Sequence, residues 1–116
     1  MRLRSDIFAS AYLRRCASQN IPAVLRRRGD AAAGAIFVSV DRGDGRATLY
    51  APAAAGESAD PAIERLWRRA HRDETIDALA LSERMGREAA FDRDLWWIEA
   101  DDAEGRHGLD LDLDRA

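Results

Sequence analysis

Residues 34–51, GAIFVSVDRGDGRATLYA, decide the fold that the sequence predicts. In Gly34–Asp41, apolar side chains occupy both alternations of the run, which is typical of a strand buried on two faces. Asp41–Arg46 (DRGDGR) then offers two Asp/Gly pairs, residue types that tolerate the positive φ angles of a tight turn. A second β-rich run, Ala47–Ala51, follows and stops at Pro52. We therefore predict a β-hairpin over this stretch.

A helix and a shorter strand are expected before the hairpin. Ser5 can cap a helix whose apolar residues recur at helical spacing as far as Cys16. Pro22 ends this helix, because the residue before a proline is pushed towards extended geometry. Val24–Arg28 then predicts a strand, and Gly29 begins the loop that leads to the hairpin.

Two helices are expected after the hairpin. Residues 51–60 are mostly small, which indicates a flexible internal loop. Pro61 suits the first position of a helix, whose apolar stripe runs from Ile63 to Ala70. A further helix is predicted from about Thr75 to Ala90.

Two strands complete the predicted fold. Leu95–Ala100 (LWWIEA) predicts a buried strand whose two tryptophans point to opposite faces. Leucine and aspartate alternate strictly in Leu109–Asp114, which predicts a strand with one wet face, and residues 114–116 are expected to form a disordered tail. The order α-β-β-β-α-α-β-β favours the α+β class: a single domain over residues 1–116, with a mostly antiparallel sheet of about five strands and helices packed on one face.

The composition limits the classes of function. Of the 116 residues, 47% are hydrophobic, which is enough for a core without disulfides, and the single cysteine, Cys16, fits a reducing compartment. No run suits a signal peptide or a membrane span, so we expect a cytoplasmic protein. All 18 basic residues are arginines, which excludes a phosphate-loop lysine and a Schiff base. The net charge of −3 argues against a dedicated duplex binder.

Arginines supply the main candidate binding residues. Arg26, Arg27 and Arg28 precede a glycine, and guanidiniums beside glycine amides suit an anion. A phosphate loop would open a helix, whereas a β-rich run follows here, so a strand end with solvated or paired arginines is the simpler interpretation. On an uninterrupted strand Arg26 and Arg28 share a face. Arg14 and Arg15 are expected to join this surface.

A second basic face is expected on the helix predicted after Pro61. The spacing i, i+3, i+4, i+7 places four arginines opposite the apolar stripe: Arg65, Arg68, Arg69 and Arg72. Such a face suits RNA or an acidic partner, although a solvated outer face has the same pattern. Tyr50 and Trp67 would be the stacking partners of RNA bases.

The sequence offers little support for catalysis. Five carboxylates around LWWIEA are the only basis for a metal-dependent hydrolase: Asp92, Asp94, Glu99, Asp101 and Asp102. Cys16 has no histidine at a spacing that identifies a nucleophile–base pair; the two histidines are His71 and His107. We therefore assign no catalytic residue, no metal ligand and no cofactor.

Several segments resemble a family of short alphaproteobacterial proteins, domain of unknown function 1491. The resemblance rests on RLRSDIFASAYLRRC, LRRRGDAAAGAIFV, the Asp-Gly turn and FDRDLWWIEADDAEGRHGL, which together cover most of the chain. It implies a bacterial cytoplasmic setting and a single compact domain. It implies no activity, because the family has none assigned and offers no catalytic residues.

The leading hypothesis is therefore a non-catalytic binding or regulatory module that contacts a protein partner through its arginine-rich surface, as a monomer or a homodimer. The alternative is an RNA-binding or polyanion-binding protein. The second alternative is a metal-dependent hydrolase that uses the Asp92–Asp102 carboxylates. No membrane association is expected.

Overall fold

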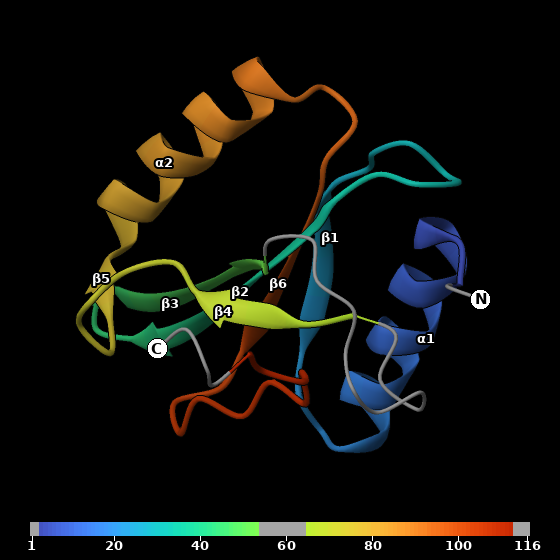
Figure 1. Cartoon of the computed structure of the whole chain (residues 1–116). Helices are drawn as coiled ribbons and strands as arrows, with labels where there is room; N and C mark the ends of the chain where they lie inside the picture. The colour runs from blue at the N-terminus through green and yellow to red at the C-terminus, as the bar shows by residue number, and fades with distance from the viewer. Residues whose placement is uncertain (1–2, 54–64, 113–116) are drawn as a thin grey trace.

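A computed structural model of the chain describes residues 3–53 and 65–112. Most of the loop predicted over residues 51–60, and the whole tail predicted over residues 114–116, lie outside the described residues. The elements follow in the order α1 (Ser5–Ser18), β1 (Ala23–Arg27), β2 (Ile36–Gly43), β3 (Arg46–Pro52), β4 (Trp67–Arg69), β5 (Ile76–Asp77), α2 (Ala78–Phe91) and β6 (Trp96–Asp101) (Figure 1).

One mixed sheet contains all six of these strands. Its order is β1-β6-β2-β3-β4, and β5 pairs with the same strand as β4, namely β3. The β2–β6 pair is parallel, and the other pairs are antiparallel. The last strand along the chain, β6, therefore lies between β1 and β2. The predicted α+β class is confirmed.

The predicted hairpin is the β2–β3 pair. Asp44 and the two glycines that flank it have positive φ angles, 54° for Asp44, 85° for Gly43 and 73° for Gly45. A register shift between Asp41 and Gly43 absorbs the extra residue of the turn. The turn chemistry of DRGDGR thus fixes the register that buries both faces of β2.

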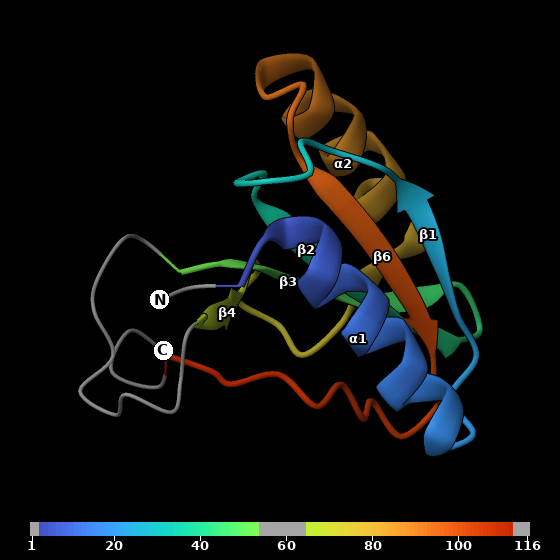
Figure 2. The ribbon, with the colours of Figure 1, turned by 90° about the vertical axis from the view of Figure 1, so that its right-hand side faces the viewer.

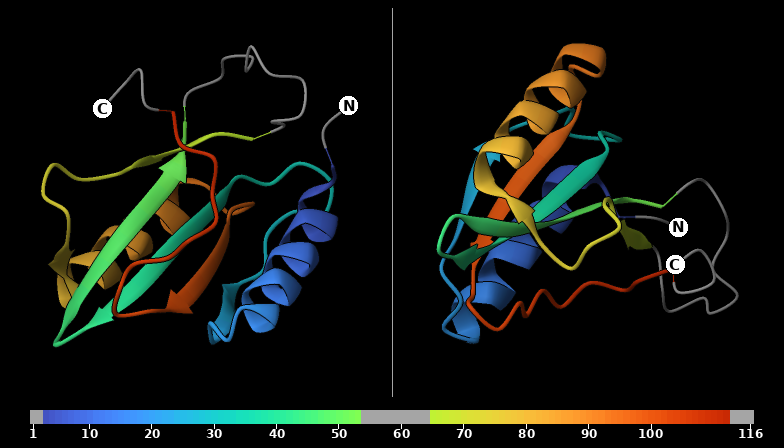
Figure 3. Two further views of the ribbon diagram at one scale, coloured as in Figure 1. Left: turned by 90° about the horizontal axis from the view of Figure 1, so that it is seen from below. Right: turned by 90° about the vertical axis from the view of Figure 1, so that its left-hand side faces the viewer.

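One helix covers each face of the sheet. On one face, Ala9, Tyr12 and Cys16 of α1 pack in a cluster with alternate residues of β2 and β6: Ile36, Val38, Val40, Trp96, Ile98 and Ala100. On the other face, Leu81 and Met85 of α2 pack against the remaining alternation: Phe37, Ala47, Leu49, Ala51 and Leu95. Figure 2 shows α1 in front of β6, and the right panel of Figure 3 shows α2 in front of the sheet. The prediction that the helices pack on one face is wrong for α1 and α2, because a strand that is apolar on both alternations needs cover on both sides.

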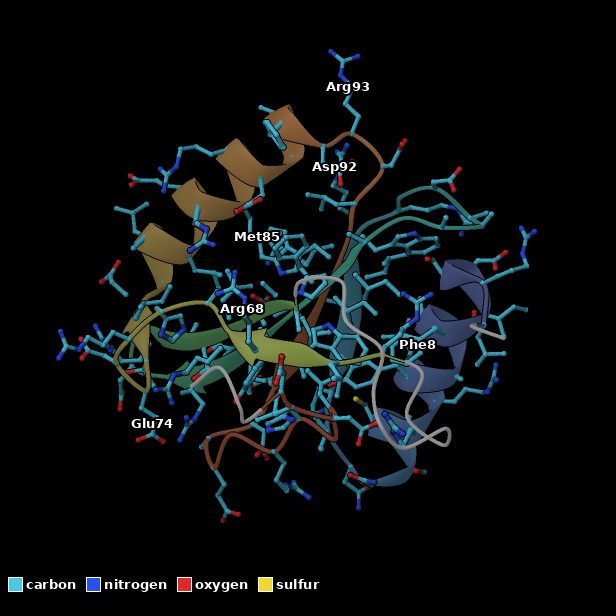
Figure 4. All side chains as sticks on the ribbon, in the orientation of Figure 1. Phe8, Arg68, Glu74, Met85, Asp92 and Arg93 are labelled. Carbon is cyan, nitrogen blue, oxygen red and sulfur yellow. The ribbon has the colours of Figure 1, made fainter. Side chains whose placement is uncertain are left out.

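The helix α2 begins at a side-chain cap. Asp77 accepts hydrogen bonds from the backbone amides of Leu79 and Ala80 at 2.8 and 3.3 Å, which satisfies donors that the first turn leaves open. Met85 points from the helix to the sheet (Figure 4). Within the described residues, no helix is long and apolar enough to cross a membrane.

Two predicted elements are absent or different. The helix predicted after Pro61 begins outside the described residues, and its described part contains the short strand β4, which pairs with Tyr50–Pro52 of β3. The strand predicted over Leu109–Asp114 is reduced, within the described residues, to a single bridge between Leu111 and Trp67. Over residues 3–53 and 65–112, the observed order is therefore α-β-β-β-β-β-α-β.

Two glycines allow the loop after β1 to lie directly against the start of β6. A Cβ atom on Gly29 would lie 2.6 Å from the carbonyl carbon of Leu95, and one on Gly34 would lie 2.9 Å from Cδ1 of Trp96. Either would also overlap the carbonyl oxygen of Asp94. The role of these glycines is thus close backbone approach.

Candidate functional site

The arginines of β1 diverge to the two faces of the sheet. A register shift between Leu25 and Arg27 interrupts the β1–β6 ladder. Arg26 lies over the ring of Trp97 at 4.5 Å and pairs with Glu99 at 2.9 Å. The prediction that Arg26 and Arg28 share a face is wrong, because a bulge breaks the alternation of side chains along a strand.

Arg28 lies on the α1 side of the sheet. Its guanidinium is 5.2 Å from the ring centre of Trp96. The pKa of Asp6 in α1 is lowered, first by its hydrogen bond from Arg4 and to a smaller extent by the charge of Arg28. Arg27 donates to the carbonyl of Arg93 at 2.9 Å. Arg93 lies at the turn after α2 (Figure 4). The three arginines therefore surround the end of β1 and do not converge.

Arg14 and Arg15 point to different sides of α1, because consecutive helical residues are about 100° apart around the axis. Arg15 donates to the carbonyl of Gly108 at 3.0 Å and lies 5.5 Å from the ring centre of Tyr12. Arg14 is exposed. The predicted surface of five arginines thus does not exist as one patch.

The second predicted basic face is also divided. Arg68 and Arg69 lie on β4, and Arg69 donates to the carbonyl oxygens of His71 and Arg72 at 3.1 and 2.9 Å. Arg65 is only 9% exposed and donates to the carbonyl of Leu3 at 2.8 Å. The prediction of one helical face with four arginines is therefore wrong, because β4 pairs with β3 and this segment does not form a helix. The four arginines are Arg65, Arg68, Arg69 and Arg72.

One arginine from each predicted cluster meets at a pocket of about 300 Å³. Its walls come from the N-terminal segment, α1, the segment that includes β4, and the C-terminal segment: Leu3, Phe8, Arg15, Arg65, Trp67, Gly108, Leu109 and Asp110. We call it the Arg15–Arg65 pocket. No spacing in the sequence links these four segments.

Aromatic rings position both guanidiniums of this pocket. Phe8 projects from α1 towards β4 (Figure 4), and its ring centre lies 5.2 Å from that of Trp67 and 6.2 Å from that of Tyr12. Arg65 lies 5.3 Å from the ring centre of Phe8, just as Arg15 lies over the ring of Tyr12. Cation–π contacts of this kind hold each charge in place beside an apolar wall.

A second surface is the outer edge of β1. The carbonyl of Pro22 accepts from the amide of Asp101 at 2.8 Å, so Pro22 and Asp101 form a hydrogen-bonded pair of the antiparallel ladder. Hydrogen-bonded and non-hydrogen-bonded pairs alternate along such a ladder. The backbone groups of Val24 therefore point towards β6, and those of Ala23 and Leu25 point outward. No backbone hydrogen bond within residues 3–53 and 65–112 reaches these outward groups. We call this surface the β1 edge.

The side chains of the β1 edge are unusually apolar for an exposed strand. Val24 and Leu25 are 54% and 38% exposed. A shallow hollow of about 460 Å³ lies beside the strand, lined by Leu13, Ala17, Asn20, Ile21, Pro22 and Ala23. An extended segment added to β1 would place alternate side chains against this hollow.

The carboxylates proposed for a metal site are dispersed. Glu99 pairs with Arg26, and Asp102 pairs with Arg106 at 3.0 Å. Asp92 accepts from the amide of Asp94 at 2.9 Å and so closes the turn after α2. Within residues 3–53 and 65–112, no three His, Cys, Asp or Glu side chains are placed to share a metal ion.

Both histidines accept backbone hydrogen bonds. Nε2 of His71 accepts from the amide of Leu49 at 2.9 Å, and Nδ1 of His107 accepts from the amide of Leu109 at 2.9 Å. Burial lowers the pKa of each imidazole below its ordinary value. Burial also raises the pKa of Tyr12, whose hydroxyl donates to the carbonyl of His107 at 2.6 Å. These groups hold loops in place.

We expect the fold to lose stability as the pH falls below 6.5, the ordinary pKa of histidine. The unfolded chain takes up protons near that pH, whereas His71 and His107 resist protonation in the folded state, so the unfolded state gains protons first. Urea unfolding at about pH 7.5 and about pH 5.5 measures the effect. His71→Gln keeps a hydrogen-bond acceptor that does not titrate, so this variant should lose less stability between the two pH values. The same urea midpoint at both pH values in the native protein would contradict this prediction.

The sequence matches the family described as protein of unknown function (DUF1491) over residues 3–110. The chain belongs to the DUF1491 family. Solved structures agree with this assignment. A crystal structure of a DUF1491 family protein from Caulobacter crescentus is 33% identical, with a TM-score of 0.77, and the match covers 97% of this chain and 99% of that one.

Two solution structures give the same result. An NMR structure of a DUF1491 family protein from Caulobacter crescentus has a TM-score of 0.77 and 34% identity over 97% of this chain and 98% of that one. A protein from A. tumefaciens also has a TM-score of 0.77 and 34% identity, over 96% of this chain and 95% of that one. A comparison with curated proteins gives no match. The resemblance expected from the sequence is confirmed, and the DUF1491 family brings no known activity to this chain.

Proposed function

We propose that this DUF1491 protein is a non-catalytic protein-binding module that takes an acidic, extended segment of a partner along the β1 edge. The observation that carries the proposal is the outward direction of the Ala23 and Leu25 backbone groups on the last strand of the sheet. Such a strand is a template for a further strand, whose main-chain hydrogen bonds supply affinity.

Apolar contacts would add to these hydrogen bonds. In the ladder, Val24 lies opposite Glu99 on the α2 face, and Leu25 lies opposite Ile98 on the α1 face. An added strand would therefore meet one exposed apolar side chain on each face. Alternating side chains of the partner would reach the hollow beside α1.

The charge at the end of β1 favours an acidic partner. Arg26 and Arg28 lie on opposite faces of the strand end, so carboxylates on either alternation of the partner would meet a guanidinium. In its ion pair with Glu99, the side chain of Arg26 is 42% exposed. Exposed ion pairs contribute little stability, so Arg26 can turn to a partner carboxylate at small cost.

RNA is less well supported as the partner. Tyr50 and Trp67, the residues expected to stack on bases, are 9% and 3% exposed. The arginine clusters also point to separate sides of the molecule, whereas a nucleic-acid backbone needs a continuous basic track. A peptide strand needs only one edge and a few charges.

A blocked peptide of alternating leucine and aspartate should bind the protein, and the amide signals of Val24 and Leu25 should shift in a titration followed by NMR. A peptide with lysine in place of aspartate should bind less well. Leu25→Pro removes one outward donor and should weaken binding about tenfold, because the facing carbonyl loses its hydrogen bond. Proline is tolerated on edge strands where the amide faces outward.

A charge-matched pair of variants separates the edge from a general charge effect. Val24→Glu places a negative charge on the β1 edge and should weaken binding, whereas Leu79→Glu places the same charge at a 68% exposed position of α2 and should not. Equal weakening by both variants would overturn the proposal. Equal binding of the lysine peptide, or β1-edge dimers that exclude the peptide, would also overturn it.

A further inference from the structure

The Arg15–Arg65 pocket differs in chemistry from the β1 edge. We infer that it binds a small organic carboxylate that carries an aromatic or aliphatic group. The pocket combines two guanidiniums with an apolar wall of Leu3, Phe8, Trp67 and Leu109. A volume of about 300 Å³ suits a small molecule and is too small for a folded partner.

The guanidiniums are set in place before any ligand arrives. Arg65 is 9% exposed and is held by the ring of Phe8 and the carbonyl of Leu3. Arg15 is held by the ring of Tyr12 and the carbonyl of Gly108. Because these contacts fix both side chains, a ligand would lose little free energy in ordering them.

The two guanidiniums favour a negative group on the ligand. Among the described residues, the lining contains Arg15, Arg65 and one carboxylate, Asp110. A carboxylate on the ligand matches the planar geometry of a guanidinium. The bond from Arg15 to the carbonyl of Gly108 uses one of the five N–H donors of the guanidinium, so Arg15 can bind a ligand without leaving its position.

The positions of the aromatic rings favour an apolar body on the ligand. Trp67 is 3% exposed, and its Nε1 donates to the carbonyl of Ile36 at 2.8 Å, so its indole is held in a fixed orientation. Phe8 lies beside it. A ring or a branched chain on the ligand would extend this existing row of aromatic side chains.

The pocket is independent of the β1 edge. Phe8 and Arg15 lie on the side of α1 that faces the C-terminal segment, whereas Leu13 and Ala17 lie on the side that faces β1. A ligand in the pocket and a peptide on the edge would therefore contact different residues. Failure of one proposal leaves the other testable.

3-Phenylpropionate is a suitable probe, and 3-phenylpropionamide is its neutral counterpart. Titration of the whole protein, followed by NMR, should shift the indole signal of Trp67 and the amide signal of Gly108. We expect the carboxylate to bind about tenfold more tightly than the amide, since charged hydrogen bonds are the stronger ones. Equal binding of the two probes, or unmoved signals at millimolar concentration, would overturn the inference.

Arg15→Gln and Arg14→Gln form a matched pair on α1. Arg15→Gln should weaken binding of 3-phenylpropionate about tenfold, because it removes one of the two charges. Arg14→Gln removes the same charge from the other side of the helix and should leave binding unchanged. Both arginines are exposed, so neither replacement opens a cavity in the core. Equal effects of the two variants would overturn the assignment of the pocket.

Discussion

Gly34→Ala is expected to lower the free energy of unfolding by about 3 kcal/mol, the upper part of the range for overpacked sites. The new methyl group would overlap the carbonyl oxygen of Asp94 and would lie 2.9 Å from Cδ1 of Trp96. Trp96 is 1% exposed and cannot move aside, and the carbonyl belongs to the backbone. The loop would have to withdraw from β6. Urea unfolding followed by circular dichroism measures the loss.

Gly86→Ala is the matched control. Gly86 lies in α2, and a Cβ atom there would meet nothing within 4 Å. Alanine is a better helix former than glycine, so the free energy of unfolding of this variant should rise by about 0.5–1 kcal/mol. The same substitution would thus have opposite signs at two positions. A Gly34→Ala variant as stable as the native protein would show that the loop does not lie against β6 as described.

Trp67→Ala is expected to lower the free energy of unfolding by about 4 kcal/mol, as is typical when a large buried aromatic side chain is removed. Trp67 joins three parts of the molecule. Its ring packs against Phe8 of α1, its Nε1 donates to Ile36 of β2, and its backbone bonds to Asp110 and Asp112. Removal of the side chain leaves a cavity and an unsatisfied carbonyl. A loss of this size is a large fraction of the stability of a small protein.

Arg68→Ala provides the control on the same strand. Arg68 is exposed and next in sequence, so its replacement should change the free energy of unfolding by no more than about 0.5 kcal/mol. Circular dichroism is the appropriate probe, because Trp67→Ala also changes the fluorescence. A cost below about 1 kcal/mol for Trp67→Ala would contradict the central position given to this residue.

The parts of the fold that sequence could predict are those with local signals. The hairpin followed from two β-rich runs, the first of them apolar on both alternations, and from the turn chemistry at Asp41–Arg46. The strand β6 followed from LWWIEA. The helix predicted through Trp67 failed, because a three-residue strand carries no period of its own and depends on its pairing with β3. The sequence did contain a signal that both faces of the sheet are covered. Phe37 lies between Ile36 and Val38, so both sides of β2 required a helix.

The candidate sites were less accessible to sequence reasoning. Arg26 and Arg28 were assigned to one face because alternation was assumed, and a bulge leaves no clear mark in a run of three arginines. Arg65 was placed on a solvated helical face, although it is buried against Phe8. The pocket unites Arg15 and Arg65 with a C-terminal segment, and only tertiary packing brings them together.

The position of β6 has a consequence for how the chain is made. Among the strands of the described residues, β6 is translated last, yet it lies inside the sheet between β1 and β2. The sheet partner of β1 does not exist until the ribosome has released Trp96–Asp101. Pairings between such distant segments form slowly, and unpaired strands are prone to aggregate. Synthesis therefore leaves β1 without its sheet partner on the nascent chain until β6 emerges from the ribosome.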